Sequence, residues 1–341
     1  MAASELAKIA RTLVAEGKGI LAADESTGTI EKRFQSIEVE STEETRRAYR
    51  NLLLTTEGAA DYISGVILYD ETIRQSSSDG TPFPRLLEGQ GIVSGIKVDK
   101  GAKPLAGAPG ETVTEGLDGL RDRLGEYREL GARFTKWRAV IDIGDGLPTP
   151  YAIHVNAHAL GRYAALSQEA GLVPIVEPEV LMDGEHTIDR CYEVTEATLH
   201  TVFHELHLQH VELEGMLLKP NMVLSGKDAS TQAGVQDVAE QTIRCLRATV
   251  PAAVPGLVFL SGGQSDEVAT AHLNAMNAIG EVPWELSFSY GRALQAPALK
   301  AWVGKEENVI AGQEAYLHRA RLNGAARSGS YSEEMEGAVT A

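Results

Sequence analysis

Residues 215–223, which read GMLLKPNMV, form a short apolar run that breaks off in Lys219 and Pro220. Such a run is typical of a buried strand, and proline cannot donate to a β-ladder, so we predict that the strand ends there. The amine of Lys219 then lies at the exit of the strand. Most lysines in such a position extend their charge into water. An amine kept partly dry and near other cations instead has a neutral form that attacks carbonyls, and the other strand ends decide between these two interpretations.

The rest of the chain repeats this pattern, with apolar runs that alternate with helical stretches. We predict eight strands, at residues 19–24, 61–69, 93–98, 133–143, 172–181, 215–219, 254–260 and 284–289. This alternation is typical of βα units around a parallel sheet. Eight units favour the α/β class and a closed (β/α)8 TIM barrel. A doubly wound open sheet is the alternative, but no GxGxxG motif follows the first strand.

The chain organisation indicates one large domain. A length of 341 residues with 43% hydrophobic residues suffices for a single barrel core. We predict that the barrel domain spans residues 1–322 and opens with an amphipathic helix. Ser41 and Glu44 form the capping-box pattern of a helix start after the first strand. Residues 323–341 are rich in Gly, Ala, Ser and Glu, and we predict that they form a flexible tail.

Charge and cysteine content exclude several classes of protein. The formal net charge of −17 disfavours binding to nucleic acid or to an anionic membrane surface. No apolar run is long enough to span a bilayer, and the N-terminal residues lack the apolar core of a signal peptide. Cys191 and Cys245 stand alone, without the CxxC spacing of a thiolate metal site. We therefore predict a cytoplasmic protein that uses no metal or cofactor.

Paired charges occur in two neighbouring strands. Lys136 and Arg138 lie two residues apart in the fourth strand, and Glu177 and Glu179 have the same spacing in the fifth. Because side chains alternate along a strand, each pair shares one face. A single residue of this kind is usually solvated or part of a structural ion pair. Burying the whole set unpaired would cost several kcal/mol per ion, so we expect the two pairs to meet Lys219 at the barrel mouth, where barrels carry their chemistry.

This assembly suits imine catalysis on a phosphorylated carbonyl compound. Lys219 supplies the amine, and Lys136 with Arg138 supplies positive surroundings. Dehydration of a carbinolamine needs a general acid and carbon–carbon cleavage needs a base, so the carboxylates Glu177 and Glu179 suit both steps. The predicted catalytic residues are Asp24, Lys136, Glu177, Glu179 and Lys219.

Two groups of residues at the strand ends are suited to phosphate. Barrels often bind phosphate after the seventh and eighth strands, through backbone N–H groups and a helix N-terminus. The first predicted group consists of Ser261, Gly262, Gly263, Ser289, Gly291 and Arg292. The second group, across the barrel mouth, consists of Ser26, Thr29, Arg33, Lys97 and Arg138. Two adjacent glycines usually mark only a turn, so the barrel context carries this prediction.

Several motifs closely resemble class I fructose-bisphosphate aldolase. They are LAADESTGTI (21–30), GIKVDKG (95–101), FTKWR (134–138), VPIVEPE (173–179), LLKPN (217–221), FLSGGQS (259–265) and FSYGRALQ (288–295). The resemblance covers about residues 4–320. It implies an eight-stranded barrel, often tetrameric, that reversibly cleaves fructose 1,6-bisphosphate into dihydroxyacetone phosphate and glyceraldehyde 3-phosphate in glycolysis and gluconeogenesis.

The same resemblance implies roles for the predicted residues. Lys219 would form the Schiff base and Glu177 would be the principal acid and base, assisted by the other predicted catalytic residues. The first group of phosphate-binding residues would hold the phosphate next to the ketone, and the second group of residues would hold the other end of the substrate. Thr29 stands where many members have serine and keeps the hydroxyl. Eukaryotic members end in a tyrosine that assists proton exchange, whereas this chain ends in Val-Thr-Ala.

Two other classes of protein are alternatives. A metal-dependent aldolase would reach the same products with zinc as electron sink, and four histidines at helical spacing invite that reading. They are His200, His204, His207 and His210. These histidines precede the sixth strand and lie far from the strand exits, so a solvated or partner-facing helix stripe explains them. A non-enzymatic scaffolding barrel would not need the paired cations and carboxylates.

Overall fold

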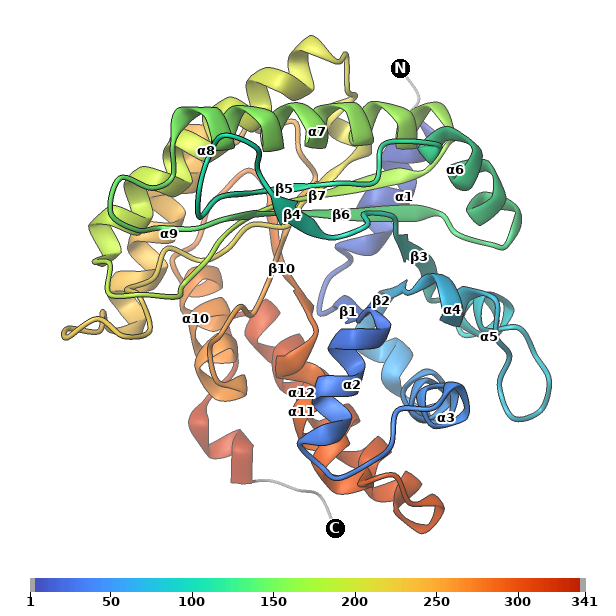
Figure 1. The fold of residues 1–341 in the computed structure, drawn as a ribbon. Helices are drawn as coiled ribbons and strands as arrows, with labels where there is room; N and C mark the ends of the chain where they lie inside the picture. Colours follow the sequence, from blue (N-terminus) through green and yellow to red (C-terminus); the bar gives the residue numbers. More distant parts are fainter. Residues whose placement is uncertain (1–3, 338–341) are drawn as a thin grey trace.

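The computed structural model describes residues 4–337, which form a closed barrel of eight parallel strands surrounded by helices (Figure 1). The barrel strands are β1 (Gly19–Ala23), β2 (Ile63–Leu68), β3 (Val93–Lys97), β6 (Phe134–Ile141), β7 (Val173–Val180), β8 (Leu217–Leu218), β9 (Gly256–Phe259) and β10 (Glu285–Tyr290). Each neighbours the preceding one along the chain, and β10 closes the ring against β1. The predicted (β/α)8 TIM barrel is therefore confirmed. A separate antiparallel pair, β4 (Ala102–Pro104) and β5 (Thr112–Thr114), lies in the stretch rich in Gly and Pro.

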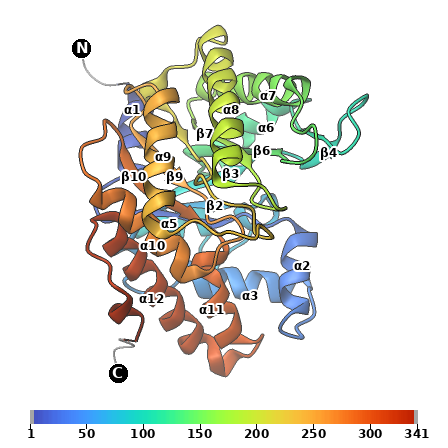
Figure 2. The same ribbon diagram turned by 90° about the vertical axis from the view of Figure 1, so that its left-hand side faces the viewer.

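Helices cover the outside of the barrel, as two views at right angles show (Figure 1 and Figure 2). They are α1 (Glu5–Leu13), α2 (Thr27–Gln35), α3 (Glu43–Leu54), α4 (Asp70–Ile73), α5 (Phe83–Gly89), α6 (Leu120–Glu129), α7 (Pro150–Glu169), α8 (Ile188–Leu208), α9 (Val235–Thr249), α10 (Asp266–Ala278), α11 (Arg292–Trp302) and α12 (Val309–Arg327). Short 3-10 helices span Ala59–Asp61, Leu213–Gly215, Glu306–Asn308 and Glu333–Gly337. Among residues 4–337, none of the helices has the length and apolar character needed to cross a membrane.

Strand β8 contains only Leu217 and Leu218, which agrees with the prediction that Pro220 ends it. The backbone N–H of Lys219 still reaches the ladder and donates to the carbonyl of Val176 at 2.8 Å. After that the side chain of Asn221 takes over, since its Oδ1 accepts from the N–H of Val180 at 3.1 Å. On the other side, the carbonyl of Pro220 accepts from the N–H of Leu260 at 3.1 Å, so backbone hydrogen bonds hold Lys219 and Pro220 between both neighbouring strands.

Helix α3 begins one residue away from the predicted position. Thr42 is its N-cap, and the Thr42 hydroxyl accepts from the N–H of Thr45 at 3.1 Å. The Thr45 hydroxyl in turn accepts from the N–H of Thr42 at 2.9 Å. Glu44 is then one position too early to close the box, and its carboxylate pairs with Arg47 instead. The predicted box of Ser41 and Glu44 was wrong, and the box is formed by the two threonines.

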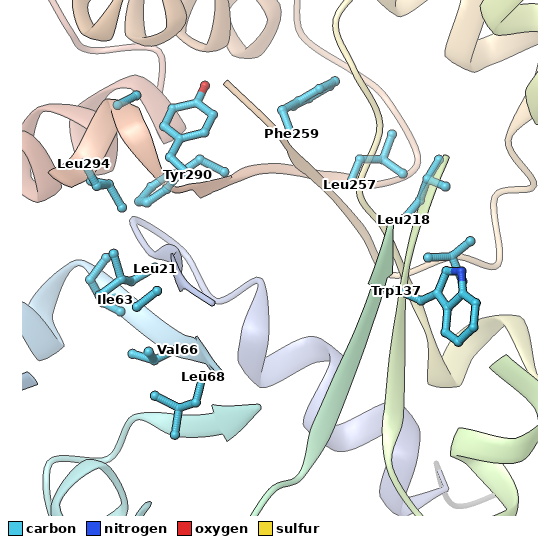
Figure 3. Close-up of a cluster of buried hydrophobic side chains, with 14 of the residues drawn as sticks. Leu21, Ile63, Val66, Leu68, Trp137, Leu218, Leu257, Phe259, Tyr290 and Leu294 are labelled. Atoms are coloured by element: carbon cyan, nitrogen blue, oxygen red, sulfur yellow. The ribbon is translucent and has the colours of Figure 1, made fainter. Parts of the chain in front are cut away.

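The larger hydrophobic core lies between the strands and the surrounding helices (Figure 3). Trp137 of β6 and Leu218 of β8 belong to it, together with Leu21 of β1. Strands β2 and β7 are buried along their whole length, because both faces of a parallel barrel sheet are covered. The strand residues of this larger core, such as Trp137, Leu218 and Leu21, face outward and pack the strands against the helices.

A second, smaller core fills the barrel interior where the strands begin. It contains Phe134, Val173, Ile175, Leu217 and Val258, closed from below by Ala10, Leu13 and Val14 of α1 and its flanking turn. Because side chains alternate along a strand, the next inward residues after Phe134, Ile175 and Leu217 are Lys136, Glu177 and Lys219. The barrel interior is thus apolar at its floor and charged at its mouth.

The C-terminal segment folds back along the barrel's outer helices. Helix α12 runs to Arg327, so the predicted domain boundary after residue 322 falls inside it. Tyr331 is only 8% exposed, and its N–H donates to Asn274 of α10 at 2.9 Å. The carboxylate of Glu336 accepts from the Tyr331 hydroxyl and from Arg319 of α12. Residues 338–341, which include the predicted tail's end, lie outside the described residues.

Candidate active site

A cavity of about 650 Å³ opens at the charged end of the barrel. The residues predicted to be catalytic all line it, namely Asp24, Lys136, Glu177, Glu179 and Lys219. The residues predicted to hold phosphate line it as well, namely Ser26, Thr29, Arg33, Lys97, Arg138, Ser261, Gly262, Ser289, Gly291 and Arg292. Gly263 is the exception, because it does not line the cavity. The structure therefore brings together residues from seven of the eight predicted strand exits.

Four buried charged residues form the centre of this cavity, and we call them the lysine–carboxylate cluster: Asp24, Lys136, Glu177 and Lys219. Lys136 Nζ lies 2.6 Å from Asp24 Oδ2 and 3.2 Å from Glu177 Oε2. Lys219 Nζ lies 3.2 Å from Glu177 Oε1. Glu177 therefore stands between the two lysines, with one oxygen facing each. The sequence predicted cations around Lys219, but its nearest charged partner is this carboxylate.

The cluster fixes the protonation of its members. Burial raises the pKa of Asp24, but Lys136 and Lys219 outweigh burial and hold the net pKa well below its usual range. Burial likewise raises the pKa of Glu177, and the same two lysines lower it more, so its net pKa is also depressed. Burial lowers the pKa of Lys136, while Asp24 and Glu177 raise it above its usual value. Lys136 is therefore a permanent cation, and both carboxylates are ionised at neutral pH.

Glu179 and the second group of predicted phosphate-binding residues form ion pairs outside the lysine–carboxylate cluster. The carboxylate of Glu179 accepts from Arg138 Nε. Lys97 Nζ lies 2.7 Å from Asp99 Oδ1, and the other oxygen of Asp99 accepts from the N–H of Arg138 at 3.2 Å. Glu179 and Asp99 thus hold the cations at this side of the mouth. Asp99 was not predicted, although it follows Lys97 at the spacing that places both on one face.

A buried carboxylate in the wall of the cavity holds Arg33 in place. Glu25 accepts from Arg50 Nη2 at 2.6 Å and from Gln295 Nε2 at 2.9 Å, and it also pairs with Arg33. Burial raises the pKa of Glu25, but Arg33 and Arg50 lower it by more than burial raises it. The net pKa is therefore depressed, and the carboxyl group is ionised. The sequence analysis missed Glu25, Arg50 and Gln295. Glu25 and Gln295 lie within the motifs at 21–30 and 288–295, which were a signal for both, whereas Arg50 lies on a helix outside the motifs and had none.

Replacing Arg50 by methionine is expected to lower the free energy of unfolding by about 3 kcal/mol, because it leaves the buried carboxylate of Glu25 with a poorer set of partners. The side chains of Arg50 and Glu25 are 3% and 4% exposed. Chemical denaturation measures the change. Arg85→Met is the matched control, since Arg85 is 72% exposed in its pair with Glu88 and such pairs add little. Equal shifts in both variants would contradict the assignment.

The first group of predicted phosphate-binding residues lies where β9 and β10 end. Ser261 and Ser289 are buried, and within residues 4–337 the hydroxyl of Ser289 has no hydrogen-bond partner. A buried polar group without a partner is rare and points to a ligand. Helix α11 begins at Arg292, so its N-terminal N–H groups add positive potential. Across the mouth, Ser26 precedes α2 in the same way, and its hydroxyl lies 3.0 Å from that of Thr29.

The four histidines of the metal-dependent alternative lie away from the cavity. His200, His204 and His207 belong to α8, and His210 follows it, and all four are exposed. Among the described residues, no group of three or more His, Cys, Asp or Glu side chains is arranged to hold a metal ion. These histidines therefore form an exposed stripe on the outside of the barrel, away from the cavity.

A buried lysine among carboxylates at the mouth of a closed (β/α)8 barrel is an arrangement suited to an enzyme that forms an imine with a carbonyl compound. Residues 5–341 match the glycolytic family described as fructose-bisphosphate aldolase class-I. The chain is 60% identical to a probable fructose-bisphosphate aldolase class 1 of Xanthomonas campestris pv. campestris over 97% of its length and 99% of the relative's. It is 57% identical to the cytosolic fructose-bisphosphate aldolase 6 of Arabidopsis thaliana, over 98% of this chain and 93% of that one.

A solved structure agrees with these relatives. The fructose-bisphosphate aldolase of Plasmodium falciparum, crystallised with TRAP and a small-molecule inhibitor, superposes with a TM-score of 0.95 at 52% identity. The match covers 96% of this chain and 95% of the other. The chain belongs to the class I fructose-bisphosphate aldolase family.

Proposed function

We propose that this enzyme cleaves D-fructose 1,6-bisphosphate reversibly into dihydroxyacetone phosphate and D-glyceraldehyde 3-phosphate through a Schiff base on Lys219. The observation that carries this assignment is the contact of 3.2 Å between Lys219 Nζ and Glu177 Oε1 in a buried cavity. A lysine that touches a carboxylate can pass its proton on and attack as a neutral amine. Family membership supports the substrate.

Imine formation uses Glu177 in both of its protonation states. The carboxylate takes a proton from the Lys219 ammonium, and the neutral amine adds to the ketone carbon C2. Glu177, now a carboxylic acid, returns the proton to the carbinolamine hydroxyl, which leaves as water and generates the iminium ion. Lys136 keeps its charge throughout because Asp24 and Glu177 both stabilise it. Its positive charge therefore stabilises the Glu177 carboxylate when that carboxylate is regenerated.

Cleavage then follows with the iminium ion as electron sink. A carboxylate of the cluster, which we assign to Glu177 with assistance from Asp24, takes the proton from the C4 hydroxyl. The C3–C4 bond breaks, its electron pair forms the enamine, and C4 becomes the aldehyde of glyceraldehyde 3-phosphate. Protonation of the enamine at C3 and hydrolysis of the imine release dihydroxyacetone phosphate. Glu179 contributes indirectly by holding Arg138.

The two ends of the cavity suit the two phosphates. We assign the phosphate next to the ketone to Ser261, Gly262, Ser289, Gly291 and Arg292, and the distant phosphate to Ser26, Thr29, Arg33, Lys97 and Arg138. Support comes from the unpartnered hydroxyl of Ser289 and from the two helix N-termini that face the mouth. The cytosolic names of plant relatives support a cytoplasmic enzyme, and the family resemblance supports a homotetramer.

Borohydride added with dihydroxyacetone phosphate is expected to inactivate the enzyme and to label Lys219 alone, because reduction converts an imine into a stable secondary amine. Peptide mapping by mass spectrometry locates the label. EDTA should leave both turnover and labelling unchanged, since the iminium ion serves as the electron sink that zinc supplies in a metal-dependent aldolase. A label on another lysine, or turnover lost to EDTA and restored by zinc, would argue against the proposed mechanism.

A further inference from the structure

The turn that follows β9 contains a peptide unit held at both of its ends. The carbonyl of Gly262 accepts from Arg292 Nη2. The N–H of Gly263, which belongs to the same peptide unit, donates to Met182 Sδ at 3.1 Å. Gly262 adopts a left-handed backbone conformation with φ +58°, so the turn depends on glycine there. Arg292 and Met182 therefore fix the plane of one peptide from opposite sides.

The backbone of Met182 is itself held by a hydrogen bond. It lies just after β7, and its carbonyl accepts from the N–H of Lys227 in the loop after β8 at 2.7 Å. Its side chain then reaches the turn after β9, where a Cβ built on Gly263 would lie 2.9 Å from the sulfur. The methionine thus connects the loops after three consecutive strands at the barrel mouth.

The substrate phosphate competes for one of the two contacts on this peptide but not for the other. Arg292 is also the cation that a phosphate attracts, so its contact with the Gly262 carbonyl competes with substrate. Met182 has no charge and meets no such competitor. Within residues 4–337 the N–H of Gly262 itself has no acceptor, and Gly262 lines the cavity, whereas Gly263 does not. Holding the Gly262–Gly263 peptide keeps the turn after β9, and with it Gly262 at the cavity wall, in one conformation.

We propose that Met182 is a positioning residue for the substrate phosphate next to the ketone: its thioether holds the Gly263 N–H, so that the turn keeps Gly262 at the cavity wall while Arg292 engages the phosphate. This role rests on the proposed function and explains why Gly263, although part of the predicted group, faces away from the site. Met182 acts on phosphate binding through the backbone, without touching the reacting atoms.

Met182→Leu tests the proposal, since it keeps the apolar bulk and removes the acceptor. It is expected to raise KM for fructose 1,6-bisphosphate about fivefold and to leave kcat within about twofold, because one lost hydrogen bond of about 1 kcal/mol corresponds to that factor. The dissociation constant of inorganic phosphate, measured by calorimetry, should rise by a similar factor. Met182→Gln, with an amide oxygen at similar reach, should restore both constants toward wild type.

Met276→Leu, a change in the buried core away from the mouth, controls for the general effect of replacing methionine. Wild-type KM and phosphate affinity in Met182→Leu would show that Met182 only packs, and a Gln variant as weak as the Leu variant would overturn the role of the acceptor. A fall in kcat at constant KM would also contradict positioning. Failure of the wild-type enzyme to cleave the bisphosphate would instead refute the proposed function, and calorimetry with phosphate separates that outcome from the others.

Discussion

Replacing Lys219 by arginine is expected to abolish cleavage of fructose 1,6-bisphosphate. The guanidinium group stays protonated and cannot add to a ketone, so the nucleophile is lost. The positive charge beside Glu177 is retained, and the ion pairs of the lysine–carboxylate cluster should therefore survive. A coupled assay for glyceraldehyde 3-phosphate measures the loss down to its detection limit, and circular dichroism checks that the variant is folded.

Lys8→Arg provides the matched control for this substitution. Lys8 lies on the exposed side of α1, where its side chain is 63% exposed, and the same chemical change there should leave turnover at the wild-type rate. Measurable cleavage by the Lys219→Arg enzyme, or borohydride labelling of that enzyme, would show that another amine forms the imine.

Glu177→Gln is expected to lower kcat by roughly 10² or more, because a positioned acid or base contributes about that factor. Glutamine has the same shape but transfers no proton, and it removes the anion that faces both Lys136 and Lys219. Single-turnover trapping with borohydride measures imine formation separately from cleavage, and we expect imine formation to slow. Glu179→Gln should lose less and mainly through KM, since Glu179 contacts Arg138 instead of the lysines. Equal losses of kcat in the two variants would contradict the assignment of Glu177.

The depressed pKa of Glu177 sets the direction of its pH dependence. Since burial raises this pKa and the two lysines lower it more, the carboxylate persists at pH values where an ordinary glutamate begins to protonate. Its contribution to stability is present above the pKa of the unfolded chain and is lost as the pH falls through the lower folded value. Acid inactivation attributable to Glu177 is therefore expected below the usual range of a glutamate. The Glu177→Gln enzyme should lack that component of the pH profile.

The sequence predicted the barrel because its signals are local. Apolar runs, Pro220 after β8 and the spacing of two between Lys136 and Arg138 or between Glu177 and Glu179 depend only on strand geometry. The details of helices were less predictable. The capping box lies at Thr42 and not at Ser41 because the hydroxyls of Thr42 and Thr45 accept from each other's backbone N–H groups. Helix α12 extends past the predicted boundary because residues poor in helical patterning are held by tertiary packing.

Which residues line the cavity could be predicted, with Gly263 as the exception, but their partners could not. Period two places Glu179 and Glu177 on one face, yet one carboxylate pairs with Arg138 and the other with two lysines. Which pairs form depends on the offset between neighbouring strands, and that register is invisible in the sequence. Gly263 is a similar case, because its N–H turns toward Met182, a residue distant in the chain. Pairing across strands is thus the information that only the three-dimensional structure supplies.

The apolar floor of the barrel has a consequence for how the chain folds. Helix α1 leaves the ribosome early, but its buried side belongs to the same apolar cluster as Leu217 and Val258, and the hydroxyl of Ser4 at its N-cap donates to Glu212, 208 positions later. Contacts between such distant segments form late, since the intervening chain has to be ordered first. Closing the floor is therefore a late event in folding, and until the later strands arrive the apolar side of α1 is a surface that a chaperone would recognise.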